Sequence, residues 1–273
     1  MSLSVRNGPT AFDPPPDPRD ALETAGDITR FGWRLLRSLA HIRPYLGEVM
    51  RQAAMIATGS VLVIVAVAFL AGASCGLESS ALARAFGASP VAGGFSTWCT
   101  LREVVPFVFG YILAAKVGCG MVAELSAMRV QEEIDALETM GVKSLAYLGG
   151  TRLLGAAIAL PAAYVLAIAT SYAAAYLMSV ERFGDVSPGT WKLYFFTFQD
   201  KWDLIFSMTK GLVIAVFVIV VALHHGYGLR ARGPVDVGVA TARSMATSII
   251  GVTLISTVGT LIFWGANPRI PFG

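Results

Sequence analysis

Five long apolar segments dominate the chain, and each reaches about the 20 residues that a helix needs to cross a bilayer. We expect them to be transmembrane helices at Met55–Ser74, Val104–Met128, Leu145–Met178, Leu204–Leu223 and Ser244–Gly265. The third segment is long enough to be tilted, and Pro161 predicts a kink within it. The pattern predicts an all-α polytopic membrane protein.

A basic amphipathic pattern precedes the first of these segments. Between residues 26 and 52, apolar residues recur at helical spacing, and Arg30, Arg34 and Arg37 lie on another face. Together with Trp33, this pattern favours a helix that lies in the headgroup plane, directly before the first span. A solvated helix packed on a partner would have the same pattern.

The composition supports a membrane protein with a polar tail. Apolar residues make up 55% of the chain and charged residues only 14%, whereas charged residues make up about 25% of soluble domains. Residues 1–25 are polar and rich in Pro and Asp, which predicts a disordered cytosolic tail. They contain no apolar stretch of the signal-peptide type, so we expect the first span to direct insertion. Residues 53–273 form the expected transmembrane domain.

The segment between the first two spans, residues 75–100, has no single interpretation. It is apolar in part but is broken by Glu78 and Pro90, so it predicts either a re-entrant segment or a surface helix pair outside. Cys75 and Cys99 flank it, and an oxidising compartment would allow a disulfide between them. We favour the alternative, two unpaired apolar thiols.

An acidic amphipathic helix is predicted at Arg129–Gly141, between the second and third spans. Apolar residues share one face, and acidic residues cover the other: Val130, Ile134, Leu137 and Met140 against Glu132, Glu133, Asp135 and Glu138. A solvated loop helix is the simplest interpretation. However, the complete apolar stripe favours a helix that lies across the ends of the spans and offers one side to a soluble partner.

Charged residues also fall within or at the ends of the second span. A charge at the centre of a span costs roughly 2.5–3.5 kcal/mol on insertion scales, so Lys116 and Glu124 need an explanation. In one interpretation both side chains pair with neighbouring residues, and Glu124 then pairs with Arg129. In the other they form a polar point in a transport cavity. Arg102 and Glu103 lie where this span emerges outside.

The distribution of Lys and Arg predicts the orientation. Thirteen of these residues lie on the side of the N-terminus and the acidic helix, and seven lie on the opposite side. Because basic residues are enriched in cytoplasmic loops, we expect the N-terminus and the acidic helix in the cytoplasm and the C-terminus outside. The protein is then a multi-pass protein of the plasma (inner) membrane.

One long motif resembles a known family. Residues 100–142 read TLREVVPFVFGYILAAKVGCGMVAELSAMRVQEEIDALETMGV, followed later by HGY at 225–227 and GPVDVGVATARSM at 233–245. This pattern is similar to that of the MlaE/YrbE permeases, the membrane subunits of ABC transporters that move lipids. It is nearest to the actinobacterial YrbE subunits that accompany Mce proteins, and to the "B" member of their A/B pair.

The resemblance implies an MlaE-like permease fold and a set of partners. A cytosolic ABC ATPase would dock on a coupling helix at 129–141, a second YrbE-type permease would complete a heterodimer, and Mce-domain proteins would cover the core outside. The residues expected to contact the ATPase are Arg129, Gln131, Glu132, Glu133, Asp135 and Glu138.

The resemblance also implies that this chain forms a lipid cavity and that a separate ATPase hydrolyses ATP. It places the lipid near Arg102 and Glu103, with Lys116 and Glu124 as further polar points. The lipid is a fatty acid, a mycolic acid derivative, a phospholipid or a sterol, and import is the family's expected direction. The chain has no G-x-x-x-x-G-K-[ST] motif, so we expect ATP and Mg²⁺ on the ATPase and no catalytic, cofactor or metal site here. No nucleic-acid partner is expected.

Two other classes of function compete with this one. A proton-coupled secondary transporter would use Lys116 and Glu124 as its titrating groups. An intramembrane enzyme acting on lipids has less support, because the spans contain no HExxH motif and no paired aspartates.

Overall fold

The computed structural model describes residues 18–184, 186–228 and 233–265, and within them it contains helices and no strands. Five helical segments are long and apolar enough to cross a membrane: Arg43–Ala85, Ser89–Val130, Leu145–Arg182, Lys201–Tyr227 and Pro234–Gly265. This confirms the predicted all-α fold and its five spans, although every span is longer than predicted.

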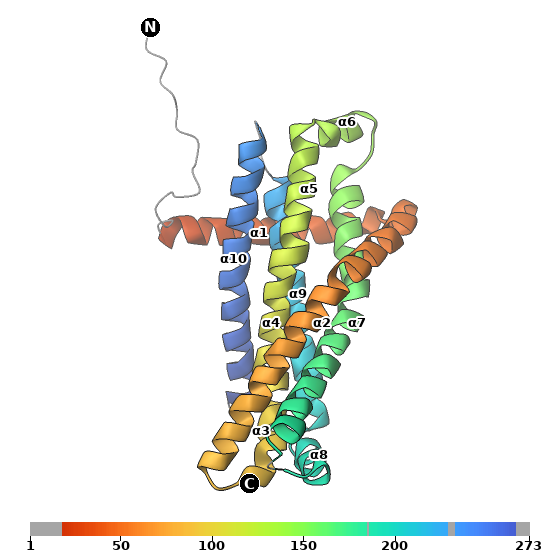
Figure 1. Ribbon diagram of the computed structural model, residues 1–273. Coiled ribbons are helices and arrows are strands. Elements are labelled where there is room, and N and C mark those ends of the chain that lie inside the picture. The colour runs from red at the N-terminus through yellow and green to blue at the C-terminus, as the bar shows by residue number, and fades with distance from the viewer. Residues whose placement is uncertain (1–17, 185, 229–232, 266–273) are drawn as a thin grey trace.

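The spans form an upright bundle, crossed near one end by α1 (Figure 1). The α-helices are α1 (Pro18–Ser38), α2 (Leu46–Ala85), α3 (Ala92–Trp98), α4 (Val105–Ile112), α5 (Cys119–Val130), α6 (Glu133–Thr139), α7 (Thr151–Tyr176), α8 (Pro188–Thr197), α9 (Lys201–Tyr227) and α10 (Pro234–Thr260). Short 3₁₀ turns lie at η1 (Leu39–His41), η2 (Arg43–Tyr45) and η3 (Ser89–Val91).

Five π-helical turns interrupt or end the spans. They are η4 (Cys99–Val104), η5 (Leu113–Gly118), η6 (Leu145–Gly150), η7 (Leu177–Arg182) and η8 (Leu261–Gly265). Turns of this kind occur often at functional sites. Arg102 and Glu103 lie in η4 and Lys116 lies in η5, so three of the charged residues singled out in the sequence fall on such turns.

The segment 75–100 is neither a re-entrant loop nor a surface helix pair, because each half continues a long helix. Its first part is the end of α2, and its second part opens the next span through α3 and η4. The corner between them contains Gly87, whose φ of +65° suits a residue without a side chain. Cys75 and Cys99 form a disulfide beside this corner, so the expectation of unpaired thiols was wrong.

The most extensive helix contact in the bundle is between α2 and α7. A Cβ atom added at Gly72 would lie 2.2 Å from the backbone oxygen of Ser171, so only glycine allows the two backbones to approach this far. The hydroxyl of Ser171 donates to the Ala68 carbonyl across the same contact at 2.8 Å. Small residues and hydroxyl hydrogen bonds are the usual means of helix association inside membranes.

Helix α1 differs in its bounds from the predicted interfacial helix. It begins at Pro18 and ends at Ser38, and the chain then passes through η1 and η2 before α2 begins at Leu46. Residues 46–52 are therefore part of the first span. Phe31 and Leu35 are buried against the bundle, whereas Trp33 is exposed. The remainder of the predicted tail, residues 1–17, lies outside the described residues.

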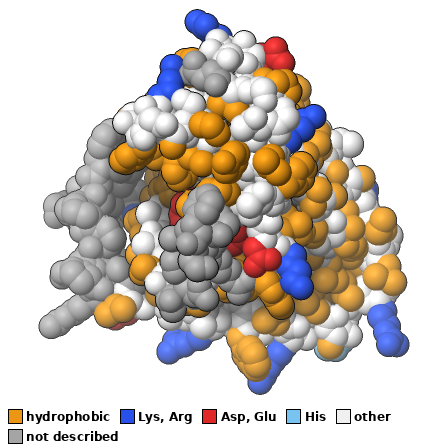
Figure 2. Space-filling view, turned by 90° about the horizontal axis from the view of Figure 1, so that it is seen from below, with side chains coloured by type: hydrophobic (Ala, Val, Ile, Leu, Met, Phe, Trp, Pro, Cys, Tyr) orange, Lys and Arg blue, Asp and Glu red, His pale blue; other side chains and the backbone are white. Residues whose placement is uncertain are grey.

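The bundle has two ends that differ in character. The end that carries α6 also contains the start of α7 and the end of α9, and we call it the α6 end. The opposite end, with α3, α8 and the start of α9, is the α8 end (Figure 1). Seen from below in Figure 2, the α8 end shows wide hydrophobic surfaces with Lys and Arg side chains toward its rim.

Candidate functional site

Four charged side chains meet near the α8 end, and we call them the charge cluster: Arg102 and Glu103 from η4, and Asp203 and Lys210 from α9. The two helices bring residues about a hundred positions apart into contact. The cluster contains two positive and two negative groups, so it is formally neutral. Burial in a bundle of apolar helices requires such pairing, because an unpaired buried charge is costly.

The first pair is almost wholly buried. Arg102 Nη2 lies 3.0 Å from Asp203 Oδ2, and the two side chains are 11% and 1% exposed. The indole Nε1 of Trp264 donates to the other carboxylate oxygen of Asp203 at 2.6 Å. The Arg102 guanidinium also lies 4.8 Å from the centre of the Trp98 ring. Arg102 is thus held between a carboxylate and an aromatic face.

The second pair is open on one side. Lys210 Nζ lies 3.3 Å from Glu103 Oε2, and it also donates to the Arg102 carbonyl at 2.8 Å and to Thr260 Oγ1 at 2.7 Å. The hydroxyl of Thr260 in turn donates to Glu103. The Lys210 side chain is fully buried, whereas that of Glu103 is 48% exposed. Glu103 is therefore the member of the cluster that faces the surface.

An apolar groove of about 340 Å³ runs beside this pair, between α9 and α10. Its lining residues are Lys210, Val213, Leu254, Ile255, Val258, Gly259, Ile262 and Phe263. Only the aliphatic stem of Lys210 is available there, because its ammonium group is occupied by three acceptors. The groove is chemically suited to an alkyl chain.

The sequence led to half of this cluster. Arg102 and Glu103 were predicted at the end of the second span, but their partners Asp203 and Lys210 were missed. The available signal was Lys210 itself, a basic residue six positions into an apolar segment that was counted only for orientation. Asp203 lies one residue before the predicted fourth segment, Leu204–Leu223, and was not singled out.

The other two predicted intramembrane charges, Lys116 and Glu124, lie apart from the cluster. Lys116 is exposed, and among the described residues it has no ion pair or hydrogen bond. Glu124 pairs with Arg152 of α7 at 2.7 Å, not with Arg129 as expected. Five residues along a helix lie on nearly opposite faces, which separates Glu124 from Arg129. The Arg152 side chain is 3% exposed, so Glu124 compensates a buried charge.

The predicted acidic helix is shorter than its sequence pattern. Helix α5 continues through Val130, residues 131–132 form a turn, and α6 covers only Glu133–Thr139. Glu132 adopts φ 58° in this turn, a left-handed conformation that ends one helix before the next begins. Ile134 is fully buried under α6, whereas Met140 is exposed, so the apolar stripe is covered only in part.

Two sets of contacts hold α6 against the bundle. At its start, Arg129 lies 2.7 Å from Asp135 and donates to the backbone carbonyl of Tyr227 at 3.1 Å. At its end, the hydroxyl of Ser144 donates to Glu138 at 2.5 Å, and the hydroxyl of Tyr227 donates to the same oxygen at 3.1 Å. The hydrogen bond from Ser144 holds the pKa of Glu138 below its ordinary value, with further help from Tyr227 and Arg129. Gln131, Glu132 and Glu133 remain exposed at the tip.

No group of His, Cys, Asp and Glu side chains within residues 18–184, 186–228 and 233–265 is arranged to hold a metal ion. The two ends of the bundle differ in their surfaces: an exposed acidic tip lies at α6, and a neutral charge cluster lies beside an apolar groove at the α8 end.

Comparison with known proteins gives the family. The family described as Permease MlaE matches residues 49–262, which overlap all five spans and include α6 and the charge cluster. A probable ABC transporter permease protein of Rickettsia conorii is 25% identical over 242 residues, covering 89% of this chain and 93% of the relative. The intermembrane phospholipid transport system permease protein MlaE of Haemophilus influenzae is 26% identical over 245 residues, covering 88% and 93%. The chloroplastic protein TRIGALACTOSYLDIACYLGLYCEROL 1 of Arabidopsis thaliana is 25% identical over 179 residues, covering 65% and 51%. The chain belongs to the MlaE permease family.

Proposed function

We propose that this chain is the membrane-spanning permease subunit of an ATP-driven lipid transporter of the Mce-linked type. The observation that carries the proposal is the family match over residues 49–262, together with the names of the relatives, which include ABC permeases and a phospholipid permease. Fatty acids, mycolic acid derivatives, phospholipids and sterols are all compatible with the apolar groove. Import is the direction that we propose.

In this account a separate ABC ATPase docks on the α6 end. The turn and α6 present Gln131, Glu132 and Glu133 at the tip of the bundle, where a soluble partner has access to them. Because the chain has no phosphate-binding P-loop motif, ATP and Mg²⁺ belong to that partner. Residues 129–141 then act as a coupling segment.

Three independent features support the orientation that we propose. The Lys and Arg distribution favours the α6 end in the cytoplasm of a plasma (inner) membrane, with the N-terminus on the same side. The disulfide between Cys75 and Cys99 lies near the α8 end, and disulfides persist in oxidising compartments outside the cytoplasm. Exposed Trp33 and Leu36 on α1 suit the headgroup region at the α6 end. The C-terminus is then outside.

The lipid path lies at the charge cluster and the groove beside it. Glu103 is the accessible polar group, and the groove receives an alkyl chain. Exposed Lys116, midway along the second span, needs either water or another protein chain beside it, which favours a second YrbE-type permease at this face. Mce-domain proteins would meet the α8 end.

The proton-coupled alternative depends on Lys116 and Glu124 titrating together. Glu124 instead compensates Arg152, and its distance from Lys116, eight residues along one helix, is about 12 Å at 1.5 Å per residue. This separation does not favour proton exchange between the two groups.

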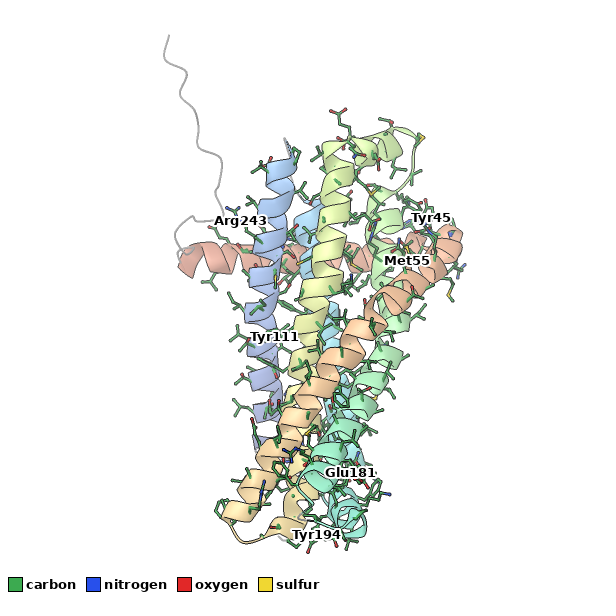
Figure 3. All side chains as sticks on the ribbon, viewed as in Figure 1. Tyr45, Met55, Tyr111, Glu181, Tyr194 and Arg243 are labelled. Atoms are coloured by element: carbon green, nitrogen blue, oxygen red, sulfur yellow. A yellow bond between two sulfur atoms is a disulfide. The ribbon has the colours of Figure 1, made fainter. Side chains whose placement is uncertain are left out.

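Charge reversal at the tip of the bundle tests the proposal. We expect the chain carrying Glu132→Lys and Glu133→Lys to lose its ATPase on purification from its native membrane. Glu181→Lys is the matched control, because Glu181 is an exposed acid at the α8 end (Figure 3). A wild-type chain that co-purifies with no ATPase, or a reversal variant that retains the ATPase in full, would refute the docking model.

A further inference from the structure

We propose that α9 transmits movement of α6 to the charge cluster, and that Tyr227 is the positioning residue that fastens α6 to α9. This inference rests on the proposed function, because the movement of α6 is attributed to an ATPase. It assigns a role to Tyr227, to Ser144 and to α9 as the helix that connects the two sites.

Tyr227 holds both ends of α6. Its backbone carbonyl accepts from Arg129, which pairs with Asp135 in the first turn of α6. Its hydroxyl donates to Glu138 near the last turn and lies 2.7 Å from the Ser144 hydroxyl. The Arg129 guanidinium also lies 5.2 Å from the centre of the Tyr227 ring. A displacement of α6 therefore pulls on the last residue of α9.

The other end of α9 carries half of the charge cluster. Asp203 and Lys210 lie in its first three turns, where they neutralise Arg102 and Glu103 of η4. The same helix thus meets α6 at one end and the second span at the other. A shift of α9 along its axis changes both ion pairs at once.

Helix α9 is the stiffer of the two connections between these sites. The direct covalent route from α6 runs back through the second span, where the π-helical turns η5 and η4 interrupt the helix. Such turns are places where helices bend. By contrast, Lys201–Tyr227 is one uninterrupted α-helix of 27 residues, about 40 Å long at 1.5 Å per residue. It packs against α4, α5, α7 and α10, which guide it along its length.

The consequence is a charge cluster that responds to α6. While α9 is in place, Arg102 and Lys210 are held in ion pairs, and Lys210 presents only its aliphatic stem to the groove. When α9 shifts, Asp203 and Lys210 move away from Arg102 and Glu103. Unpaired charges then appear beside the apolar groove, where they bind or release the polar head of a lipid. Part of this coupling passes through the Tyr227 hydroxyl, which donates to Glu138 at the end of α6.

Removal of the Tyr227 hydroxyl tests this inference. The complete complex, purified with its ATPase, is reconstituted in proteoliposomes, and ATP hydrolysis and transfer of a fluorescent phospholipid are measured in the same vesicles. We expect Tyr227→Phe to retain the ATPase and to hydrolyse ATP, but to move about tenfold less lipid per ATP. A tenfold change corresponds to the free energy of one hydrogen bond to a charged acceptor. Ser144→Ala, which leaves the ring in place, should reduce the same ratio by a smaller factor.

The control is Tyr45→Phe, because Tyr45 lies at the corner between α1 and α2 (Figure 3) and its hydroxyl has no hydrogen bond within the described part of the chain. A purely structural role for Tyr227 would lower yield, hydrolysis and transfer together, and would leave their ratio unchanged. If both Tyr227→Phe and Ser144→Ala keep the wild-type ratio, the inference is wrong and the proposed function stands. If the wild-type complex contains no ATPase, the proposed function itself fails.

Discussion

Asp203 shows how this protein keeps charges inside an apolar bundle. Its carboxylate accepts from Arg102 on one oxygen and from the Trp264 indole on the other, so both oxygens are satisfied. Burying such a pair gains little over an apolar packing of equal volume, but removing one partner leaves a stranded charge. The intact Arg102–Asp203 pair is therefore expected to fix the position of η4 against α9 more than to raise the net free energy of unfolding.

We predict that Asp203→Ala lowers the free energy of unfolding by about 3–5 kcal/mol, because Arg102 then stays buried without its counter-charge. Asp203→Asn should cost less, since the amide oxygen still accepts from Trp264. Glu181→Ala at the same end should change stability by less than about 0.5 kcal/mol. Thermal unfolding in one detergent compares the three, and equal stability of Asp203→Ala and Glu181→Ala would contradict the buried pair.

The attachment of α6 should weaken in acid. The pKa of Glu138 is held below its ordinary value of 4.5 by the hydrogen bond from Ser144. A lowered folded-state pKa stabilises the attached form fully above the unfolded-state value, and that contribution disappears as the pH falls through the lowered pKa. We expect hydrogen exchange of α6 to accelerate only below about pH 4.5. Glu138→Gln should abolish this pH dependence, whereas Glu133→Gln should keep it.

Single residues were predictable where the signal was local. Arg102 and Glu103 stood out because they open an apolar segment, and Glu124 because it interrupts one. Their partners were not predictable, because Asp203 and Arg152 come from other helices and no sequence spacing encodes that contact. The structure shows ion pairs between residues far apart in the sequence, which hydrophobic periodicity does not predict.

At the scale of elements, the α2–α7 contact depends on the absence of a side chain at Gly72. We predict that Gly72→Ala lowers the free energy of unfolding by about 1–3 kcal/mol, because the new methyl group meets the Ser171 backbone. Gly59→Ala, in the same helix with open space around it, should be neutral or stabilising by up to about 1 kcal/mol. Denaturation of both variants in the same micelles measures the two free energies of unfolding. A Gly59→Ala variant that is less stable than Gly72→Ala would contradict this packing.

Element identity was more predictable than element bounds. The five apolar segments gave the spans, but the segment 75–100 was misread as a separate element. It contains the end of one long helix, a corner at Gly87 and the start of the next. The acidic helix was overextended, because its pattern ran through Gln131 and Glu132, where the left-handed turn ends α5. Hydrophobic periodicity does not reveal a single residue with a positive φ, such as Glu132.

The disulfide gives a further check at this scale. We expect a thiol-reactive maleimide to label one cysteine per unfolded chain without reductant, Cys119, and all three after reduction. The physical reason is that a disulfide sulfur cannot attack the reagent. Intact-mass measurement counts the adducts, and labelling of Cys75 or Cys99 in the unreduced chain from its native membrane would contradict the bridge.

On the scale of the whole molecule, we propose that the two ends of the bundle have separate tasks. The α6 end has an acidic tip that we assign to a soluble partner, and the α8 end holds a neutral charge cluster beside an apolar groove that we assign to an alkyl chain. A side-chain hydrogen bond between Tyr111 and Thr253, at mid-length of the bundle, ties α4 to α10 (Figure 3). Within this bundle, α9 contacts α6 at one end through Tyr227 and the charge cluster at the other end through Asp203 and Lys210.

The energy source of transport tests the central claim most directly. The chain, purified with whatever it retains from its native membrane, is reconstituted in proteoliposomes, and transfer of a labelled phospholipid is measured with ATP, with a non-hydrolysable ATP analogue, and with a proton gradient alone. The account predicts transfer with ATP only, and loss of that transfer in the chain carrying Glu132→Lys and Glu133→Lys. Transfer driven by the proton gradient in the absence of any ATPase would contradict it.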